Sequence, residues 1–173
     1  MTTTLYLLRH AKSSWVDPMS EDHDRALSDK GRARAGALAE WMEDRALECD
    51  LVLCSIALRA RQTLEIVLPV LGSSQVRHEA DIYEASGNSI IEMLKTLDNK
   101  TERVMVVGHE PALRQTATTL AMTANGDALE RLKRKYPTSA LSMLTFGSAG
   151  WSSLVPGMGH LELFYVPPDP DAA

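Results

Sequence analysis

Apolar residues along the chain gather in short unbroken runs, and between these runs they recur every three or four positions. An unbroken run of about four to eight apolar residues is typical of a strand that is buried on both faces. Residues 76–84 have a weaker pattern, which also predicts an extended segment. The clearer runs predict strands at residues 5–8, 51–54, 104–107, 141–146 and 161–166.

The stretches between these runs have the periodicity of amphipathic helices. Helices are predicted to begin near residues 27, 57, 89 and 111, and the first extends to about residue 48. Ser28 is a suitable N-cap for the first helix, and Pro69 is expected to end the second. In the third helix, Ser89 with Glu92 predicts a capping box. Helices thus follow most of the predicted strands.

Strands that alternate with helices indicate an α/β protein with three layers, α/β/α, around a mostly parallel central sheet. Connections of helix length place neighbouring strands in the same direction. The chain of 173 residues suits a single domain without a linker or an internal repeat, and residues 167–173 are expected to form a frayed, flexible tail. Sheets of this kind bind ligands outside the carboxyl ends of their strands.

The chain carries 18 basic and 23 acidic residues, a formal net charge of −5. General binding to nucleic acid or to an anionic membrane needs a basic surface, so neither partner is expected. The start has no basic leader, and no run approaches the roughly 18 apolar residues of a membrane span. We therefore expect a cytoplasmic protein, and a monomer because no heptad pattern or large apolar face is present.

Cys49 and Cys54 form no CxxC motif and no second cluster, which argues against a disulfide framework and a structural zinc site. We expect two buried cysteines in a reducing cytoplasm, without a metal or cofactor. Residues 131–135 read Arg-Leu-Lys-Arg-Lys. They are either a solvated helix end or a patch that recruits an acidic protein surface.

Charged and titratable residues follow the predicted strands, where the carboxyl ends of the strands meet. Arg9 and His10 come directly after the first strand, and Arg59 lies one turn beyond the end of the second. Because parallel strands present these ends at one edge of the sheet, the residues should face a single crevice. The full set is Arg9, His10, Ser55, Arg59, Glu84 and His109.

This set favours a phosphate pocket. Two arginines close together tolerate each other when an anion lies between them, and the guanidinium fork matches phosphate oxygens. Helices that begin after Ser55 and after His109 would point free N–H groups at the same spot, so Ser55 is included among the phosphate-binding residues. Taken singly, Arg9 could form a structural ion pair, His109 could be an ordinary buried histidine, and Glu84 could be a solvated carboxylate.

His10 is the predicted nucleophile, because a neutral imidazole nitrogen can attack phosphorus in line. The nearby arginines would lower the pKa of its imidazole, and a hydrogen bond from its other ring nitrogen to a backbone carbonyl would fix the tautomer. Arg9, Arg59 and His109 would stabilise charge on the transferring group. Glu84 would protonate the leaving group and then activate water.

Three segments resemble the motifs of the histidine phosphatase superfamily. They are Leu7-Leu8-Arg9-His10 with Ser13 and Trp15, residues 53–63, and residues 106–111. The SixA-type phosphohistidine phosphatases are the most similar branch, through residues 9–15, residues 24–27 with Gly31, residues 82–86 and residues 136–141. The resemblance spans about residues 5–166 and implies a phosphoglycerate-mutase-like fold.

This resemblance implies a role for each matching position. His10 would carry the phosphoryl group, and Arg9, Arg59 and His109 would bind it. Arg25 occupies a place similar to that of a substrate-side arginine in the SixA-type branch. Glu84 lies where relatives place their proton donor. The implied substrate is a phosphohistidine on a protein or a small phosphate ester.

The sequence also departs from the family pattern. Ala11 replaces a common glycine, Val16 replaces the asparagine of mutases, and Ile56 replaces a proline. Glu110 replaces an asparagine and puts a carboxylate beside the pocket. This carboxylate would weaken binding of a highly charged substrate, unless it points away from the pocket.

Three other functions compete with a protein phosphohistidine phosphatase. A sugar-phosphate phosphatase or a phosphoglycerate mutase stays possible, but a mutase needs a lid that excludes water, and residues 85–102 leave room for little more than one helix. A phospho-binding module without turnover is disfavoured because the whole catalytic set is present. A metallohydrolase using His10, Glu84 and His109 is disfavoured because two arginines in the crevice would repel a divalent cation.

Overall fold

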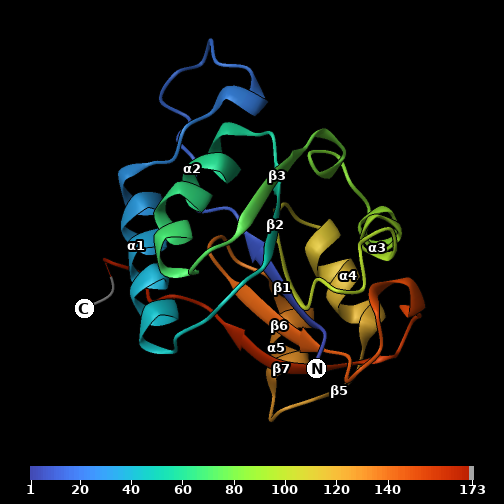
Figure 1. Ribbon diagram of the computed structural model, residues 1–173. Coiled ribbons are helices and arrows are strands. Elements are labelled where there is room, and N and C mark those ends of the chain that lie inside the picture. Colours follow the sequence, from blue (N-terminus) through green and yellow to red (C-terminus); the bar gives the residue numbers. More distant parts are fainter. Residues whose placement is uncertain (172–173) are drawn as a thin grey trace.

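The computed structural model describes residues 1–171 as a seven-stranded sheet between two layers of helices (Figure 1). The strand order is β3-β2-β4-β1-β6-β7-β5, and only β6 runs against its neighbours, β1 and β7. The predicted α/β class with a mostly parallel sheet is thus confirmed. The strands are β1 (Thr4–Arg9), β2 (Leu51–Ser55), β3 (Gln75–Glu79), β4 (Arg103–Gly108), β5 (Ala121–Ala124), β6 (Leu141–Thr145) and β7 (Gly159–Tyr165).

Helices cover both faces of the sheet, α1 and α2 on one side and α3, α4 and α5 on the other (Figure 1). Their bounds are α1 (Asp29–Asp44), α2 (Leu58–Val67), α3 (Gly87–Lys95), α4 (Ala112–Leu120) and α5 (Ala128–Arg134). Among residues 1–171 no helix is long and apolar enough to cross a membrane.

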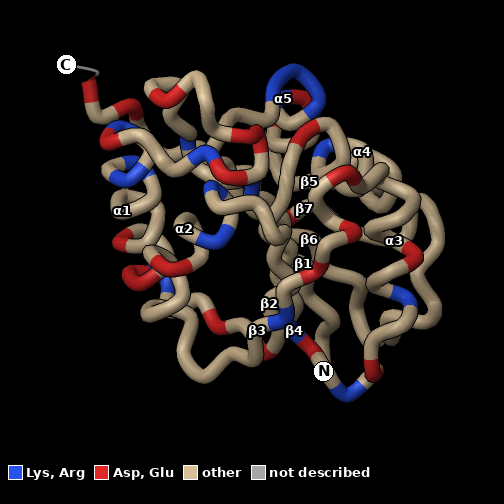
Figure 2. The backbone as a smooth tube through the Cα atoms, turned by 90° about the horizontal axis from the view of Figure 1, so that it is seen from above, with Lys and Arg blue, Asp and Glu red and all other residues tan. Residues whose placement is uncertain are grey.

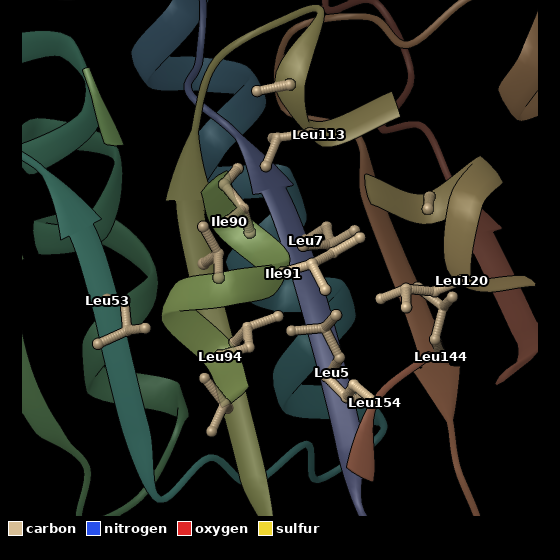
Figure 3. Packing of buried hydrophobic residues seen from close by; sticks show 14 of the residues in the cluster. Leu5, Leu7, Leu53, Ile90, Ile91, Leu94, Leu113, Leu120, Leu144 and Leu154 are labelled. Atoms are coloured by element: carbon tan, nitrogen blue, oxygen red, sulfur yellow. The ribbon is translucent and has the colours of Figure 1, made fainter. Parts of the chain in front are cut away.

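The central strand β1 contributes to two hydrophobic cores because successive side chains on a strand point to opposite faces. Leu5 and Leu7 are fully buried in the core that α3 and α4 cover (Figure 3). Tyr6 and Leu8 are buried in the core beneath α1 and α2. A strand with an apolar run on both faces can only lie inside the sheet, and β1 therefore places its carboxyl end at the middle of the sheet's edge.

Several boundaries differ from the sequence prediction for local reasons. The first helix begins at Asp29, with Ser28 as its N-cap as predicted, but it ends at Asp44 rather than near residue 48. The third helix begins earlier than predicted, because Ser86 and Ser89 form the capping box instead of Ser89 and Glu92. The extended segment ends at Glu79 and turns into a 3-10 helix over Ala80–Ile82. Glu84 therefore follows a turn rather than a strand.

The sequence pattern did not predict β5, which is only four residues long and is not an unbroken apolar run. It joins the edge of the sheet beside β7, and α5 follows it. The basic stretch at residues 131–135 forms the end of α5 and is conspicuous in Figure 2. Lys133, Arg134 and Lys135 are exposed there, as a solvated helix end requires.

The chain end was expected to be a frayed tail, but the described part of it contacts α1. Lys30 Nζ lies 3.1 Å from Asp169 and 2.9 Å from Asp171, and Arg34 donates a hydrogen bond to the carbonyl of Pro167. Exposed ion pairs of this kind stabilise a protein by about 1 kcal/mol at most. The last two residues of the predicted tail, 172 and 173, lie outside the described part.

Candidate active site

A long segment between β1 and α1 rises above the carboxyl edge of the sheet (Figure 1). Its base is well anchored, because Ser13 and Leu27 form a short antiparallel bridge and Lys12 accepts a hydrogen bond from the backbone of Ser28. The hydroxyl of Thr63 on α2 accepts a hydrogen bond of 2.9 Å from the backbone of Ala11. These contacts hold the residues that directly follow β1 against α1 and α2.

An open cavity of about 470 Å³ lies at this edge of the sheet. It brings together residues from the ends of β1 and β4, from α2, and from the loops that follow β1 and β3. Figure 2 looks down on this edge and shows basic and acidic positions side by side. The lining includes all but one of the predicted site residues: Arg9, His10, Arg25, Arg59, Glu84 and His109.

His10 has the geometry of a histidine with one fixed tautomer. Its Nδ1 lies 2.7 Å from the carbonyl oxygen of Ala11, which can only accept, so Nδ1 carries the proton and Nε2 keeps its lone pair. The ring is buried, and the pKa of His10 is lowered to about 3, mainly by burial and to a smaller extent by His109, Arg59 and Arg9. The arginines contribute as predicted, but burial is the larger cause.

Arg9 and Arg59 each keep one buried N–H donor without a hydrogen-bond partner in residues 1–171. Arg9 donates from Nη1 to the carbonyl of Tyr136 at 2.9 Å, and Arg59 donates from Nη1 to the carbonyl of Asp22 at 2.8 Å. The Nε atoms of both arginines are buried without a partner among the described residues. Burial lowers the pKa of Arg9. Buried N–H donors without partners are costly, and an anion in the cavity would satisfy them.

His109 lies beside His10, with 5.1 Å between the two ring centroids. Its Nε2 is 2.8 Å from the hydroxyl of Ser55, and its Nδ1 is buried without a partner in the described part of the chain. The pKa of His109 is lowered to about 4, mainly by burial and then by Arg59, so the ring is neutral at physiological pH. The backbone N–H of Ala57 donates to the Ser55 hydroxyl. Nε2 is the acceptor within hydrogen-bond distance of the Ser55 hydroxyl proton among residues 1–171, and donation of that proton to Nε2 would leave Nδ1 of His109 as a donor.

Ser55 was predicted to bind phosphate, but the structure places it elsewhere. Its side chain is fully buried and does not line the cavity. It lies behind His109, because β2 ends there and the next residues turn away toward α2. Ser55 therefore contacts the ring of His109 and does not reach the cavity.

Asp22 and Tyr83 also line the cavity, and sequence reasoning missed both. Asp22 belongs to a 3-10 turn (Asp22–Asp24), and its carboxylate accepts hydrogen bonds from Arg25, Arg59 and the hydroxyl of Tyr83. These contacts, that of Tyr83 first, lower the pKa of Asp22 to about 2. The spacing of Asp22 and Arg25 allows a local pair, but nothing in the sequence indicates the contacts with Arg59 and Tyr83.

The sequence profile of the histidine phosphatase superfamily (branch 1) matches residues 5–95. The chain belongs to this superfamily. An uncharacterized protein of Mycobacterium tuberculosis is 36% identical over 165 residues, which cover 92% of this chain and 99% of that protein. Membership in the superfamily supports phosphatase activity.

Two solved structures assigned as phosphohistidine phosphatase SixA are similar to this histidine phosphatase. The structure from Nakamurella multipartitia has a TM-score of 0.83 and 27% identity, and covers 96% of this chain and 97% of its own. The structure from Agrobacterium tumefaciens has a TM-score of 0.78 and 27% identity, with coverage of 96% and 99%. The resemblance to the SixA-type branch and the phosphoglycerate-mutase-like fold are thereby confirmed.

Arg25 lies at the outer part of this histidine phosphatase site. Its guanidinium donates to the hydroxyl of Ser13 and to Asp22, and it stacks at 3.5 Å over the ring of Trp15, which is 75% exposed. This pairing holds a buried arginine at the rim while an aromatic face stays open to solvent.

Two glutamates line the cavity of this histidine phosphatase in different settings. Glu84 is exposed, whereas Glu110 is partly buried, with Oε1 accepting a hydrogen bond from the backbone of Arg114 at 2.9 Å. Burial raises the pKa of Glu110. The carboxylate of Glu110 thus lines the cavity and also faces the start of α4. Of the two expected outcomes, a charge beside the pocket and a side chain that points away, each is met in part.

Proposed function

We propose that this protein is a phosphohistidine phosphatase, which hydrolyses phosphoryl groups through a covalent intermediate on Nε2 of His10. The observation that carries the proposal is the hydrogen bond from Nδ1 of His10 to the carbonyl of Ala11. It leaves Nε2 unprotonated beside two arginines, in a cavity where His109 offers another donor. A nucleophile and the donors for a phosphoryl group therefore lie in one place.

In the first step of this mechanism, Nε2 attacks phosphorus, a P–N bond forms, and the bond from phosphorus to the leaving atom breaks. Arg9, Arg59 and His109 donate to the equatorial oxygens. Glu84 is proposed to give its proton to the leaving atom, since it lines the cavity and is exposed to solvent. In the second step, Glu84 accepts a proton from water, the water oxygen attacks phosphorus, the P–N bond breaks, and inorganic phosphate leaves.

The openness of the site favours a phosphorylated side chain on another protein over a small sugar phosphate. Between Glu84 and Arg103 the chain forms only α3 and a short turn, and α3 packs on α4 rather than over the cavity. Hydrolysis tolerates such access of water, whereas transfer back to a substrate does not. The similar structures named SixA support a phosphohistidine substrate, and a cytoplasmic location stays a prediction from the sequence.

The proposal predicts an acid-labile, base-stable phosphoryl label on the wild-type protein and none on His10→Ala. The measurement uses a radiolabelled aryl phosphate with a rapid acid-free quench, followed by hydrolysis of a phosphohistidine-containing protein. Glu84→Gln should still accept the label but lose it more slowly, because activation of water is impaired. Glu110→Gln provides a comparison for loss of a different carboxyl group in the same cavity.

A wild-type protein that neither takes up label nor releases phosphate would rule out a phosphatase and favour a phospho-binding module. Label on His10→Ala would assign the nucleophile to another residue. Fast turnover of aryl phosphate without any activity on phosphohistidine protein would retain the mechanism but remove the proposed substrate. Normal turnover by Glu84→Gln would remove Glu84 from proton transfer.

A further inference from the structure

Asp22 introduces a fixed negative charge into a cavity that otherwise suits anions. It is half exposed, it lines the cavity, and its two oxygens accept from the neighbouring Arg25 and from Arg59 and Tyr83, which are distant in the chain. Arg59 meets both the carbonyl and the carboxylate of Asp22. The carboxylate is therefore held in place by the same arginine that is proposed to bind the phosphoryl group.

The charges that line the cavity are nearly balanced. Four basic side chains stand against three carboxylates, those of Asp22, Glu84 and Glu110. Both histidines are neutral at physiological pH because burial lowers the pKa of each. A phosphoryl dianion alone more than compensates the remaining positive charge. Once the buried arginines bind the phosphoryl group, the basic side chain left for a further anionic group is Lys12, which is exposed. An exposed ion pair contributes little, and the added charge would lie among the three carboxylates.

We propose that Asp22 is a specificity-determining residue, which restricts the site to phosphoryl compounds whose leaving group carries no negative charge. The inference rests on the proposed phosphatase function and names its substrate class. A neutral or protonated nitrogen leaving group, such as the imidazole of a phosphorylated histidine, belongs to this class. Phosphoglycerates and bisphosphates, which bring a second anion close to the phosphoryl group, do not.

Asp22 is a better candidate than the other two carboxylates because Arg25 and Arg59 hold it in the cavity. Glu110 is turned toward α4, with Arg114 Nε at 3.4 Å from its second oxygen. Glu84 is exposed and forms no hydrogen bond or ion pair within residues 1–171, so no contact fixes its carboxyl group in one place. Asp22 is held between Arg25 and Arg59, and all three side chains line the cavity.

The test compares glycerol 3-phosphate with 3-phosphoglycerate, which differ only in a hydroxymethyl group against a carboxylate. We expect wild-type kcat/KM to favour glycerol 3-phosphate by at least about tenfold, and Asp22→Asn to reduce this ratio severalfold by removing a charge while keeping an acceptor for Arg25. Asp22→Glu should retain the preference. Asp24→Asn makes the same charge change two residues away, outside the cavity lining, and should leave the ratio unchanged.

Binding separates a failure of this inference from a failure of the proposed function. Calorimetric affinities of both esters for His10→Ala, with and without Asp22→Asn, report the charge preference without turnover. Equal preference in wild type and Asp22→Asn, by kinetics or by binding, would overturn the role of Asp22. Absence of hydrolysis together with an Asp22-dependent binding ratio would refute the phosphatase but retain the charge selection. The ratio should also shrink at high salt, which screens exposed charges.

Discussion

At the scale of single residues, the site depends on two imidazole rings with different partners. A backbone carbonyl holds Nδ1 of His10, whereas a side-chain hydroxyl faces Nε2 of His109. A carbonyl can only accept, so the tautomer of His10 is determined by the backbone itself. The tautomer of His109 depends on one hydroxyl, that of Ser55, which can be removed by mutation.

Ser55→Ala is expected to lower kcat by roughly tenfold, less than the hundredfold or greater loss that follows removal of a direct oxyanion donor. Without the hydroxyl, Nδ1 of His109 no longer carries the proton in every molecule. The ring ¹⁵N shifts of His109 would report this change of tautomer, which a purely structural role would not cause. Ser74→Ala removes a hydroxyl that donates to Cys49 at the opposite end of the sheet, and it should leave both readouts unchanged.

At the scale of elements, the segment between β1 and the cavity is positioned by its contact with α1. Gly31 on α1 lies so close to Lys12 that an added Cβ would be 2.1 Å from the carbonyl oxygen of Lys12. Lys12 is only two residues from His10, the proposed nucleophile, so α1 supports the loop that follows His10. A side chain at this position would push that support away from the loop.

Gly31→Ala is expected to destabilise the protein by about 1 to 3 kcal/mol, because backbone must move to relieve the overlap. It should also lower kcat/KM, since the displaced backbone is that of the loop that follows His10. Gly36 lies on the same helix with nothing within 4 Å of an added Cβ. Gly36→Ala should therefore stabilise the protein by about 0.5 to 1 kcal/mol through helix propensity. Urea denaturation measures both, and equal effects of the two substitutions would contradict the contact-based argument.

At the scale of the whole molecule, burial of two neutral histidines links stability to pH. The pKa of His10 is about 3 and that of His109 about 4 in the folded protein, against an ordinary value of 6.5. Between pH 6.5 and 4 the unfolded chain binds more protons than the folded protein, so the free energy of unfolding falls as the pH falls. Asp22 has a lowered pKa of about 2, and its stabilising contribution is lost only at pH values below about 4.

The free energy of unfolding should decrease by on the order of 2 to 4 kcal/mol from pH 7 to pH 5 if both histidines contribute. Urea titrations at several pH values measure this slope. The double variant His10→Asn, His109→Asn should lose most of the dependence in this window. His78→Asn, at an exposed histidine on β3, is the control and should keep the wild-type slope. An unchanged slope in the double variant would show that other groups cause the acid sensitivity.

The strand and helix pattern was predictable because it depends on periodicity within short windows. The placement of Arg9, His10, Arg59 and His109 followed from one rule, that parallel strands present their carboxyl ends at one edge. The rule failed for Ser55, because it locates the end of a strand but not the direction of a side chain. It gave no indication of Asp22, which reaches the site from the middle of a loop.

The sequence alone therefore determined the fold class, the superfamily and the residues that end the central strands, since local periodicity and short motifs carry this information. Only the tertiary structure decided that β6 runs antiparallel, that Ser55 supports His109, and that Asp22 joins Arg59 and Tyr83. These last contacts join residues 37 and 61 positions apart in the chain. Such contacts depend on how separate elements pack against each other, and a local sequence pattern does not predict that packing.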